Sequence, residues 1–180
     1  MGGEAPTRVT FEVVGLPAPQ GSKSAYVRGG RAVVVDGSSK SGRERHARWR
    51  ADVTDAARRA RSLIAEGSFA GAVEVDVTFW FAPLRSDPYR TRHTTAPDID
   101  KLVRSVLDSL TNAGLIHDDS LVFSLSARKL YAHGPDGFVG ASVRVGDASV
   151  AEAEDREGRK AAQRAKRPAR RSPSGAVARA

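Results

Sequence analysis

Apolar and polar residues alternate along the first 145 positions with two different periods, which divide this part of the chain into strands and helices. A period of two, as over residues 72–81, is typical of a strand with one buried face. Apolar residues at i, i+3, i+4 and i+7, as over residues 100–112, are typical of a helix with one apolar face. The pattern predicts strands at 9–14, 26–28, 31–35, 72–81, 121–131 and 138–145, and helices at 41–66 and 100–112.

The order of these elements indicates the fold class. The strands are bunched with two main helices between them, which is typical of an α+β two-layer domain and not of strict βαβ alternation. We therefore expect residues 1–148 to form one domain with a mixed sheet, against which an apolar stripe of each helix packs. The stripes are His46, Trp49, Val53, Ala56, Ala60 and Leu63 in the first helix, and Leu102, Val103, Val106, Leu107 and Leu110 in the second.

The remainder, residues 149–180, differs from this body in composition. It has no aromatic residue and few large apolar ones, so we expect a largely disordered basic tail. Residues 158–180 hold eight Arg or Lys and no acid, whereas the other 21 basic residues of the chain match its 21 acids. The net charge of +8 is therefore a property of the tail, where it would add salt-sensitive affinity for nucleic acid.

Two absences in the sequence narrow the class of protein. There is no cysteine, so the chain offers neither a disulfide framework nor a thiolate zinc site. No apolar run approaches the roughly 20 residues that a membrane-spanning helix needs. These features predict a soluble protein of the cytoplasm that does not associate with a membrane.

Four carboxylates stand at the two ends of the second predicted helix. Asp98 occupies the N-cap position and Asp100 the first turn, while Asp118 and Asp119 lie between the helix and the next strand. Carboxylate oxygens suit a hard cation such as Mg²⁺, with Mn²⁺ as a second choice. In the alternative interpretation, Asp98 only caps the helix and Asp118 and Asp119 belong to an ordinary turn.

The spacing of these acids belongs to a longer pattern. Its residues are Pro97, Asp98, Ile99, Asp100, Arg104, Asp108, Ser109, Leu110, Gly114, Asp118 and Asp119. This resembles the signature of the RusA family of Holliday junction resolvases: Asp-x-Asp-Asn, a Lys four residues after the second Asp, Asp-Ala-Leu, Gly and Asp-Asp. The resemblance implies that Asp98, Asp100 and Asp119 are the metal-binding catalytic acids, with Asp118 as a neighbour at the metal site.

Two positions depart from that signature. Lys101 stands where the family has Asn, and Arg104 stands where it has Lys. Arginine keeps the charge and can hold a phosphate with two donors, although it cannot transfer a proton as a lysine amine can. We expect Arg104 to act in catalysis by holding the scissile phosphate or offsetting the negative charge, and Lys101 to contact a flanking phosphate.

Further basic residues are candidates for contact with DNA outside the acidic site. They are Lys23 in the loop after the first strand, Arg90, Arg92 and His93 in the loop 83–96, and Lys129 on the strand after the acids, where RusA-like proteins often carry a basic residue. Such residues would position DNA through its phosphates without reading its sequence. For the two loops, a solvated surface without a ligand is the alternative.

Together these features predict a Mg²⁺-dependent, structure-selective endonuclease that resolves Holliday junctions by phosphodiester hydrolysis, in recombination and repair. The resemblance implies a homodimer whose metal sites need dimerisation. The helix from Asp100 to Asn112 is roughly 18 Å long, so Asp119 must be brought back by the chain or supplied by a second subunit. The alternatives are a non-catalytic basic DNA-binding protein and a nuclease that acts on other branched DNA.

Overall fold

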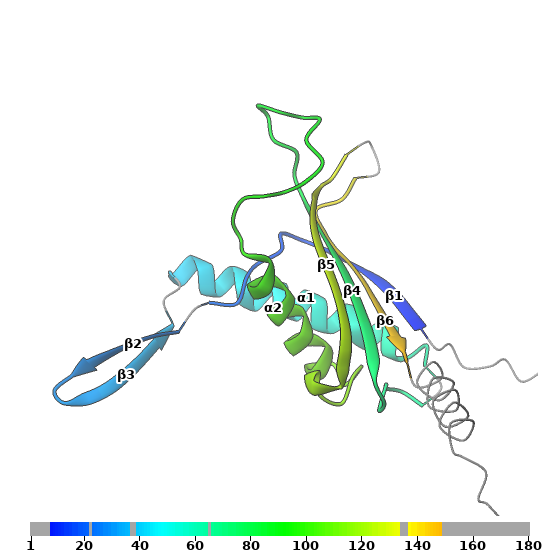
Figure 1. Cartoon of the computed structure of the whole chain (residues 1–180), viewed down its shortest axis with the longest axis horizontal. Helices are drawn as coiled ribbons and strands as arrows, with labels where there is room; N and C mark the ends of the chain where they lie inside the picture. Colours follow the sequence, from blue (N-terminus) through cyan, green and yellow to red (C-terminus); the bar gives the residue numbers. More distant parts are fainter. Residues whose placement is uncertain (1–7, 22, 37–38, 65, 134–136, 149–180) are drawn as a thin grey trace, which may run out of the picture. The chain divides into compact units, whose positions relative to one another are not determined.

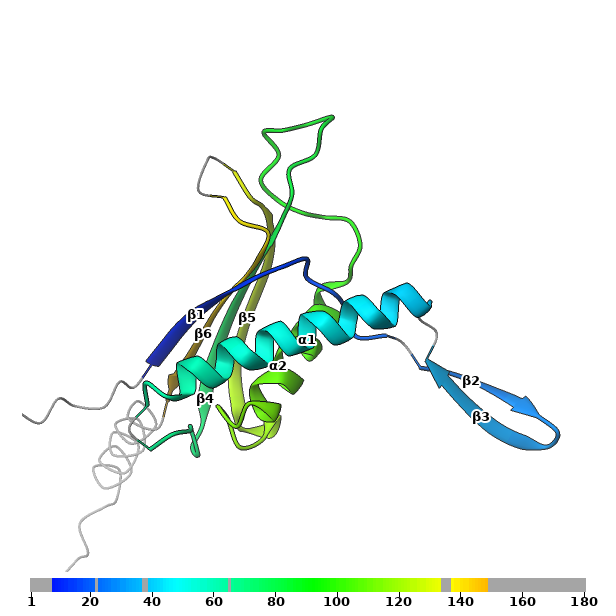
Figure 2. The same ribbon diagram turned by 180° about the vertical axis from the view of Figure 1, so that it is seen from behind.

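The computed structural model describes residues 8–21, 23–36, 39–64, 66–133 and 137–148. By its internal contacts the chain divides into two compact units, Met1–Ala148 and Ser149–Ala180. The second unit lies entirely outside the described residues, so the expectation of a disordered basic tail stays a prediction. Every element described below belongs to the first unit, which Figures 1 and 2 show from opposite sides.

A four-stranded sheet forms one layer of this unit. Its strands are β1 (Arg8–Val14), β4 (Val73–Phe81), β5 (Val122–Tyr131) and β6 (Gly140–Asp147), in the order β1-β6-β4-β5. The pairs β1–β6 and β6–β4 are antiparallel, whereas β4 and β5 are parallel. The mixed sheet predicted from the sequence is therefore confirmed.

Two helices, α1 (Lys40–Arg61) and α2 (Ile99–Asn112), form the second layer and lie on one face of the sheet (Figure 2). The β4 residues that face this layer are buried, whereas the alternate residues are partly or fully exposed. The buried residues are Val73, Val75, Val77, Phe79 and Phe81. This arrangement confirms the predicted α+β two-layer architecture. Neither helix is apolar enough over the length needed to cross a membrane, nor is any other helix among the described residues.

The ends of α1 decide which part of its apolar stripe is buried. The side chain of Ser39, the N-cap, accepts a hydrogen bond from the backbone N–H of Gly42 at 3.1 Å. Trp49 and Val53 lie in the core, as predicted. The prediction was wrong for Leu63, which is 65% exposed because the helix ends at Arg61, before that position.

The strands β2 (Lys23–Arg28) and β3 (Arg31–Asp36) form a separate two-stranded antiparallel sheet. Gly29 and Gly30 connect them with φ angles of 59° and 76°. Positive φ at both central residues is the requirement of the tight hairpin turn, and glycine meets it without steric cost. The predicted hairpin is confirmed, although β2 begins three residues earlier and β3 ends one residue later than expected.

The strand β5 lies at the edge of the main sheet and is less covered than β4. Leu125 pairs in register with the buried Val75 and so faces the helical layer, yet it is 46% exposed. Phe123, at the irregular start of the pairing with β4, is 62% exposed. The sequence pattern correctly predicted a strand here, but the helical layer does not cover these two apolar side chains.

Only part of the outer edge of β5 is unpaired. The backbone N–H of His93 donates to the carbonyl of Lys129 at 3.1 Å, and the N–H of Tyr131 donates to the carbonyl of Thr91 at 2.8 Å. The loop before α2 therefore pairs with the last residues of β5. Among the described residues, the edge left open is 122–128.

Candidate active site

Asp98 occupies the N-cap position of α2, as the sequence predicted, but its side chain makes no capping hydrogen bond. Instead, Oδ2 of Asp98 forms an ion pair with Nζ of Lys101 at 2.8 Å. The side chain of Asp98 is 59% exposed. The interpretation of Asp98 as a simple cap is therefore not supported, and its carboxylate faces outward from the start of the helix.

Lys101 also sets the charge state of this pair. Its hydrogen bond and its positive charge hold the pKa of Asp98 below the ordinary value, with a smaller contribution from the charge of Lys129. The same contact raises the pKa of Lys101. Both groups are therefore charged at neutral pH. Because Lys101 replaces the asparagine of the family signature, the first acid, Asp98, has a positively charged neighbour here.

Lys129 supports the loop that carries Asp98. Its Nζ donates to the backbone carbonyl of Thr95 at 2.6 Å and to that of Pro97 at 2.6 Å. A lysine ammonium has three donors, so one remains for another ligand. A phosphate contact by Lys129 stays a prediction, but the structure gives this residue a further role as a clamp on the loop.

His93 was counted among the exposed cations of this loop, and this expectation was wrong. Its ring is 9% exposed, stacks on Phe81 with a centroid distance of 4.0 Å, and packs at 4.9 Å from the ring of Tyr131. Burial, and then the charge of Lys129, lower the pKa of His93. The residue is a neutral part of the core beneath the loop, and the sequence around it, Arg92 before it and Thr94 after it, gave no signal of its burial.

Two clefts meet at Asp98. The first, here called the acidic cleft, contains Asp98, Asp100 and their basic neighbours; its lining is Arg92, His93, Thr94, Thr95, Ala96, Asp98, Ile99, Asp100, Arg128, Lys129 and Leu130. Its volume of about 730 Å³ falls in the range of ligand pockets. The structure thus brings together two of the predicted catalytic acids with three basic side chains.

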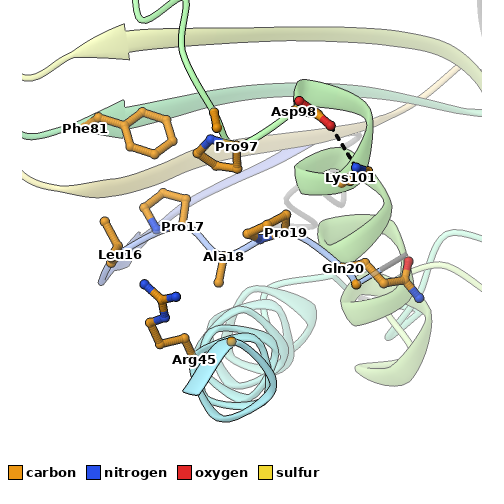
Figure 3. A pocket seen from close by; sticks show the side chains of 13 residues that line it. Leu16, Pro17, Ala18, Pro19, Gln20, Arg45, Phe81, Pro97, Asp98 and Lys101 are labelled. Carbon is orange, nitrogen blue, oxygen red and sulfur yellow. Dashed lines mark ion pairs between the residues drawn. The ribbon is translucent and has the colours of Figure 1, made fainter. Parts of the chain in front are cut away.

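The second, here called the proline cleft, also has a volume of about 730 Å³. It is formed by the loop after β1, the first two turns of α1 and the start of α2 (Figure 3). Its apolar wall consists of Leu16, Pro17, Ala18, Pro19, Phe81 and Pro97. The sequence predicted a loop after the first strand, with Lys23 as its candidate contact to DNA, and did not predict this apolar wall. The prolines at positions 17, 19 and 97 were its only signal in the sequence.

The other pair of acids lies beyond the opposite end of α2. Asp118 is the N-cap of a short 3-10 helix, η1 (Asp119–Leu121), and its Oδ1 accepts a hydrogen bond from the N–H of Ser120 at 2.9 Å. Hydrogen bonds from Ser120, first its side chain and then its backbone, lower the pKa of Asp118. The alternative interpretation as a turn is therefore correct for the local structure of Asp118, and Asp119 is exposed beside it.

One chain does not gather all the predicted acids. The 14 residues of α2 span about 21 Å, with Asp100 in its first turn and Asp119 beyond its last residue. Within the described part of the chain, no three Asp, Glu, His or Cys side chains come close enough to hold a metal ion. Asp98 and Asp100 share a cleft, whereas Asp119 does not join them.

The remaining predicted contacts are spread around the acidic cleft. Arg104 is exposed on α2 and forms no ion pair with an acid among the described residues. Arg92 lines the acidic cleft, and Arg90 is exposed beside it, where it donates to the hydroxyl of Thr94. Lys23 begins β2, and its side chain lies outside the described residues. The structure therefore supports a basic surface at Arg92 and Arg90 more directly than at Lys23.

Exposed carboxylates beside a row of basic side chains suit a protein that handles phosphate esters. The model of the endodeoxyribonuclease RusA family matches residues 18–140, which is more than half of the chain. The protein belongs to the RusA family of endodeoxyribonucleases, and the resemblance in the sequence is thereby confirmed. A comparison with curated proteins found no match.

Proposed function

We propose that the protein is a Mg²⁺-dependent endonuclease that cuts Holliday junctions during recombination and repair. The observation that carries this proposal is the meeting of Asp98 and Asp100 with Arg92, Arg128 and Lys129 in one open cleft. Paired carboxylates suit a cation, and the basic side chains suit the phosphates of DNA. The protein belongs to an endodeoxyribonuclease family, and its activity would use both the cation and the contact with DNA phosphates.

The acids of the cleft fit the predicted metal. Mg²⁺ prefers oxygen ligands, keeps several waters and is commonly held by one or two carboxylates together with a substrate phosphate. Asp98 and Asp100 would provide these carboxylates, and Asp98 is only partly engaged, since Lys101 contacts its Oδ2 alone. When bound, the metal would activate water and neutralise the phosphate oxygens. Mn²⁺ offers the same coordination chemistry.

The protein's own side chains would position the DNA around this pair. Arg92 and Arg128 border the cleft and can each hold a phosphate with two donors. Lys101 and Arg104 follow the acids on α2, where they would neutralise flanking phosphates. Lys129 would act chiefly by fixing the loop before Asp98, through its bonds to Thr95 and Pro97.

A third acid, Asp119, would come from a second copy of the chain. Within one chain the first pair lies at the start of α2 and Asp119 follows its end, and no three potential ligands meet in the described part of the chain. A homodimer resolves this difficulty, since each site could then combine Asp98 and Asp100 of one subunit with Asp119 of the other. Two symmetric sites also suit a four-way junction, which is resolved by two symmetric cuts.

The open edge of β5 is the surface we propose for this pairing. Residues 122–128 carry unpaired backbone groups, and Phe123 and Leu125 expose apolar side chains beside them. An open edge of this kind is a template for a further strand. An antiparallel pair of β5 strands, related by a two-fold axis near Leu125, would bring the start of each strand beside the end of the other. Asp119 precedes that start, and the end carries Lys129, which contacts the loop before Asp98.

A cleavage assay tests the activity. With Mg²⁺ and a synthetic four-way junction, the wild type should cut, whereas Asp100→Asn should not cut but should still bind. Asp55→Asn, which removes an exposed acid of α1 that pairs with Arg58, is the matched control and should keep full activity. A wild type that binds the junction and never cuts would establish the alternative, a non-catalytic DNA-binding protein. Preferential cutting of forks or flaps would instead identify a nuclease for other branched DNA.

A further inference from the structure

The proline cleft adjoins the acidic cleft along a shared border. Ala96 and Asp98 line both. The loop that forms the other wall of the proline cleft is tied to α2, because the N–H of Gln20 donates to the carbonyl of Lys101 at 3.1 Å. A ligand that occupies the acidic cleft therefore has the proline cleft immediately beside it, on the far side of Asp98.

The two kinds of surface in the proline cleft match the two parts of a nucleotide. Figure 3 shows Pro17, Pro19 and Pro97 around one space, with Arg45 of α1 and Lys101 of α2 at its borders. The apolar faces of the proline rings suit the face of a nucleobase, and the two cations suit its phosphate. Leu16, at the mouth, is 55% exposed, so an apolar side chain extends this wall into solvent.

We propose that the proline cleft holds a nucleobase of the DNA, unstacked from its neighbours, next to the phosphate that is cut. This inference rests on the proposed nuclease function and adds to it a binding site for one base. Enzymes that extract a base from a duplex must break its pairing and stacking, and this cost is smallest where pairing is already disturbed. Nucleotides at the branch of a junction meet that condition. The cleft would thus link the choice of the cut site to local distortion of the DNA.

Fluorescence of 2-aminopurine tests this inference separately from catalysis. The base analogue is placed beside the mapped cut site of a four-way junction, and Ca²⁺ replaces Mg²⁺ so that binding is observed without cutting. We expect the fluorescence to rise several-fold when the wild type binds, because the analogue leaves the stack. Leu16→Glu should lose most of this rise, since a carboxylate at the mouth repels the nucleotide, whereas Leu16→Met should retain it.

Leu63→Glu is the matched control, because Leu63 is an exposed leucine, at 65% against 55% for Leu16, that lies outside the cleft. It should give the wild-type rise. A wild type that binds and cuts the junction with no rise in fluorescence would overturn the inference and leave the proposed function intact. A fluorescence rise in Leu16→Glu equal to that of the wild type would also overturn the inference. So would a change in the mass of the Leu16→Glu protein, measured by light scattering, because the cleft would then be a contact between protein chains. A wild type that neither binds nor cuts any branched DNA would remove both proposals.

Discussion

The ammonium of Lys129 donates to the backbone carbonyl of Pro97 at 2.6 Å and so ties the end of β5 to the residue immediately before Asp98. The same ammonium donates to the carbonyl of Thr95. The first acid is therefore positioned by a side chain that lies far along the chain. Because hydrogen bonds from a charged donor are stronger than neutral ones, this clamp should matter for both stability and activity.

Replacing Lys129 by Met should lower the free energy of unfolding by about 1–3 kcal/mol, since two carbonyls lose a charged donor. It should also slow cutting, because the loop before Asp98 loses its support. Urea denaturation and a junction-cleavage assay measure the two effects. For the stability measurement, Arg128→Met is the control, since the side chain of Arg128 is 54% exposed and makes only a 3.6 Å ion pair with Asp76 and a 3.3 Å hydrogen bond to Ser126. Equal destabilisation by the two substitutions would contradict the clamp.

Lys101 would compete with a metal ion for Asp98, since its ammonium already contacts Oδ2 of that carboxylate. Replacing it by Asn, the residue of the family signature, should raise the pKa of Asp98 and strengthen Mg²⁺ binding about two- to fivefold, which corresponds to the free energy of one exposed ion pair. Carboxyl NMR titration reports the pKa, and the Mg²⁺ concentration for half-maximal cutting reports the binding. Lys40→Asn, at the start of α1, should change neither. If Lys101→Asn needs more Mg²⁺ than the wild type, Lys101 assists the metal site and does not compete with it.

Two inactive variants should restore activity when they are mixed. In a shared site, a heterodimer of Asp100→Asn with Asp119→Asn has one complete set of acids, with Asp98 and Asp100 from one subunit and Asp119 from the other. After subunit exchange, the mixture should therefore nick the junction, although each variant alone does not. A mixture of Asp100→Asn with Asp98→Asn should stay inactive, because in every heterodimer both sites then lack one of the two acids, Asp98 or Asp100, that a single subunit must supply together. Nicking in neither mixture, despite exchange, would place each site within one subunit.

The apolar edge of β5 should control the oligomeric state. Leu125→Arg puts a charge at the centre of the proposed strand pair and should convert the dimer into a monomer that does not cut DNA. Light scattering gives the mass. Leu63→Arg adds the same charge to an exposed leucine elsewhere and should leave the dimer unchanged. A Leu125→Arg protein that stays dimeric would show that the subunits pair through another surface.

Burial of His93 should make stability depend on pH. Its pKa in the folded chain lies below the usual 6.5, so the unfolded chain binds a proton more readily. This contribution to stability is complete above about pH 6.5 and declines as the pH falls further. His93→Phe keeps a ring against Phe81 and should flatten the decline between pH 6.5 and 5, as measured by urea denaturation. An identical pH dependence in the variant would show that His93 is not its source.

The sequence predicted the elements well because their periods are strong. The alternation in β4 and the apolar face of α2 both correspond to buried residues. It failed where burial depends on distant parts of the chain. Leu125 has the spacing of a core residue but lies outside the cover of the helices, whereas His93 sits among exposed arginines but packs beneath them.

For the candidate site, too, the sequence predicted what depends on local residues and missed what depends on distant parts of the chain. The signature located Asp98 and Asp100, which the fold brings into one cleft. The predicted length of the second helix raised the question of how Asp119 could reach the first pair, but the sequence did not decide it. Nor did the sequence predict the bond from Lys129 to Pro97, because both depend on how separate elements pack. The proline cleft likewise needs two loops to meet, and neither loop alone carries a recognisable motif.

The pairing of residues 91–93 with the last part of β5 limits where a second strand can lie. An incoming copy cannot pair beyond Arg128, and the register that uses the whole open edge, residues 122–128, is centred on Leu125. In that register the two Lys129 residues are eight positions apart along the seam, and eight residues of strand rise about 27 Å. In the proposed dimer, this length would fix the distance between the two cuts in the DNA. The backbone geometry of the paired strands would determine that distance before any DNA is bound.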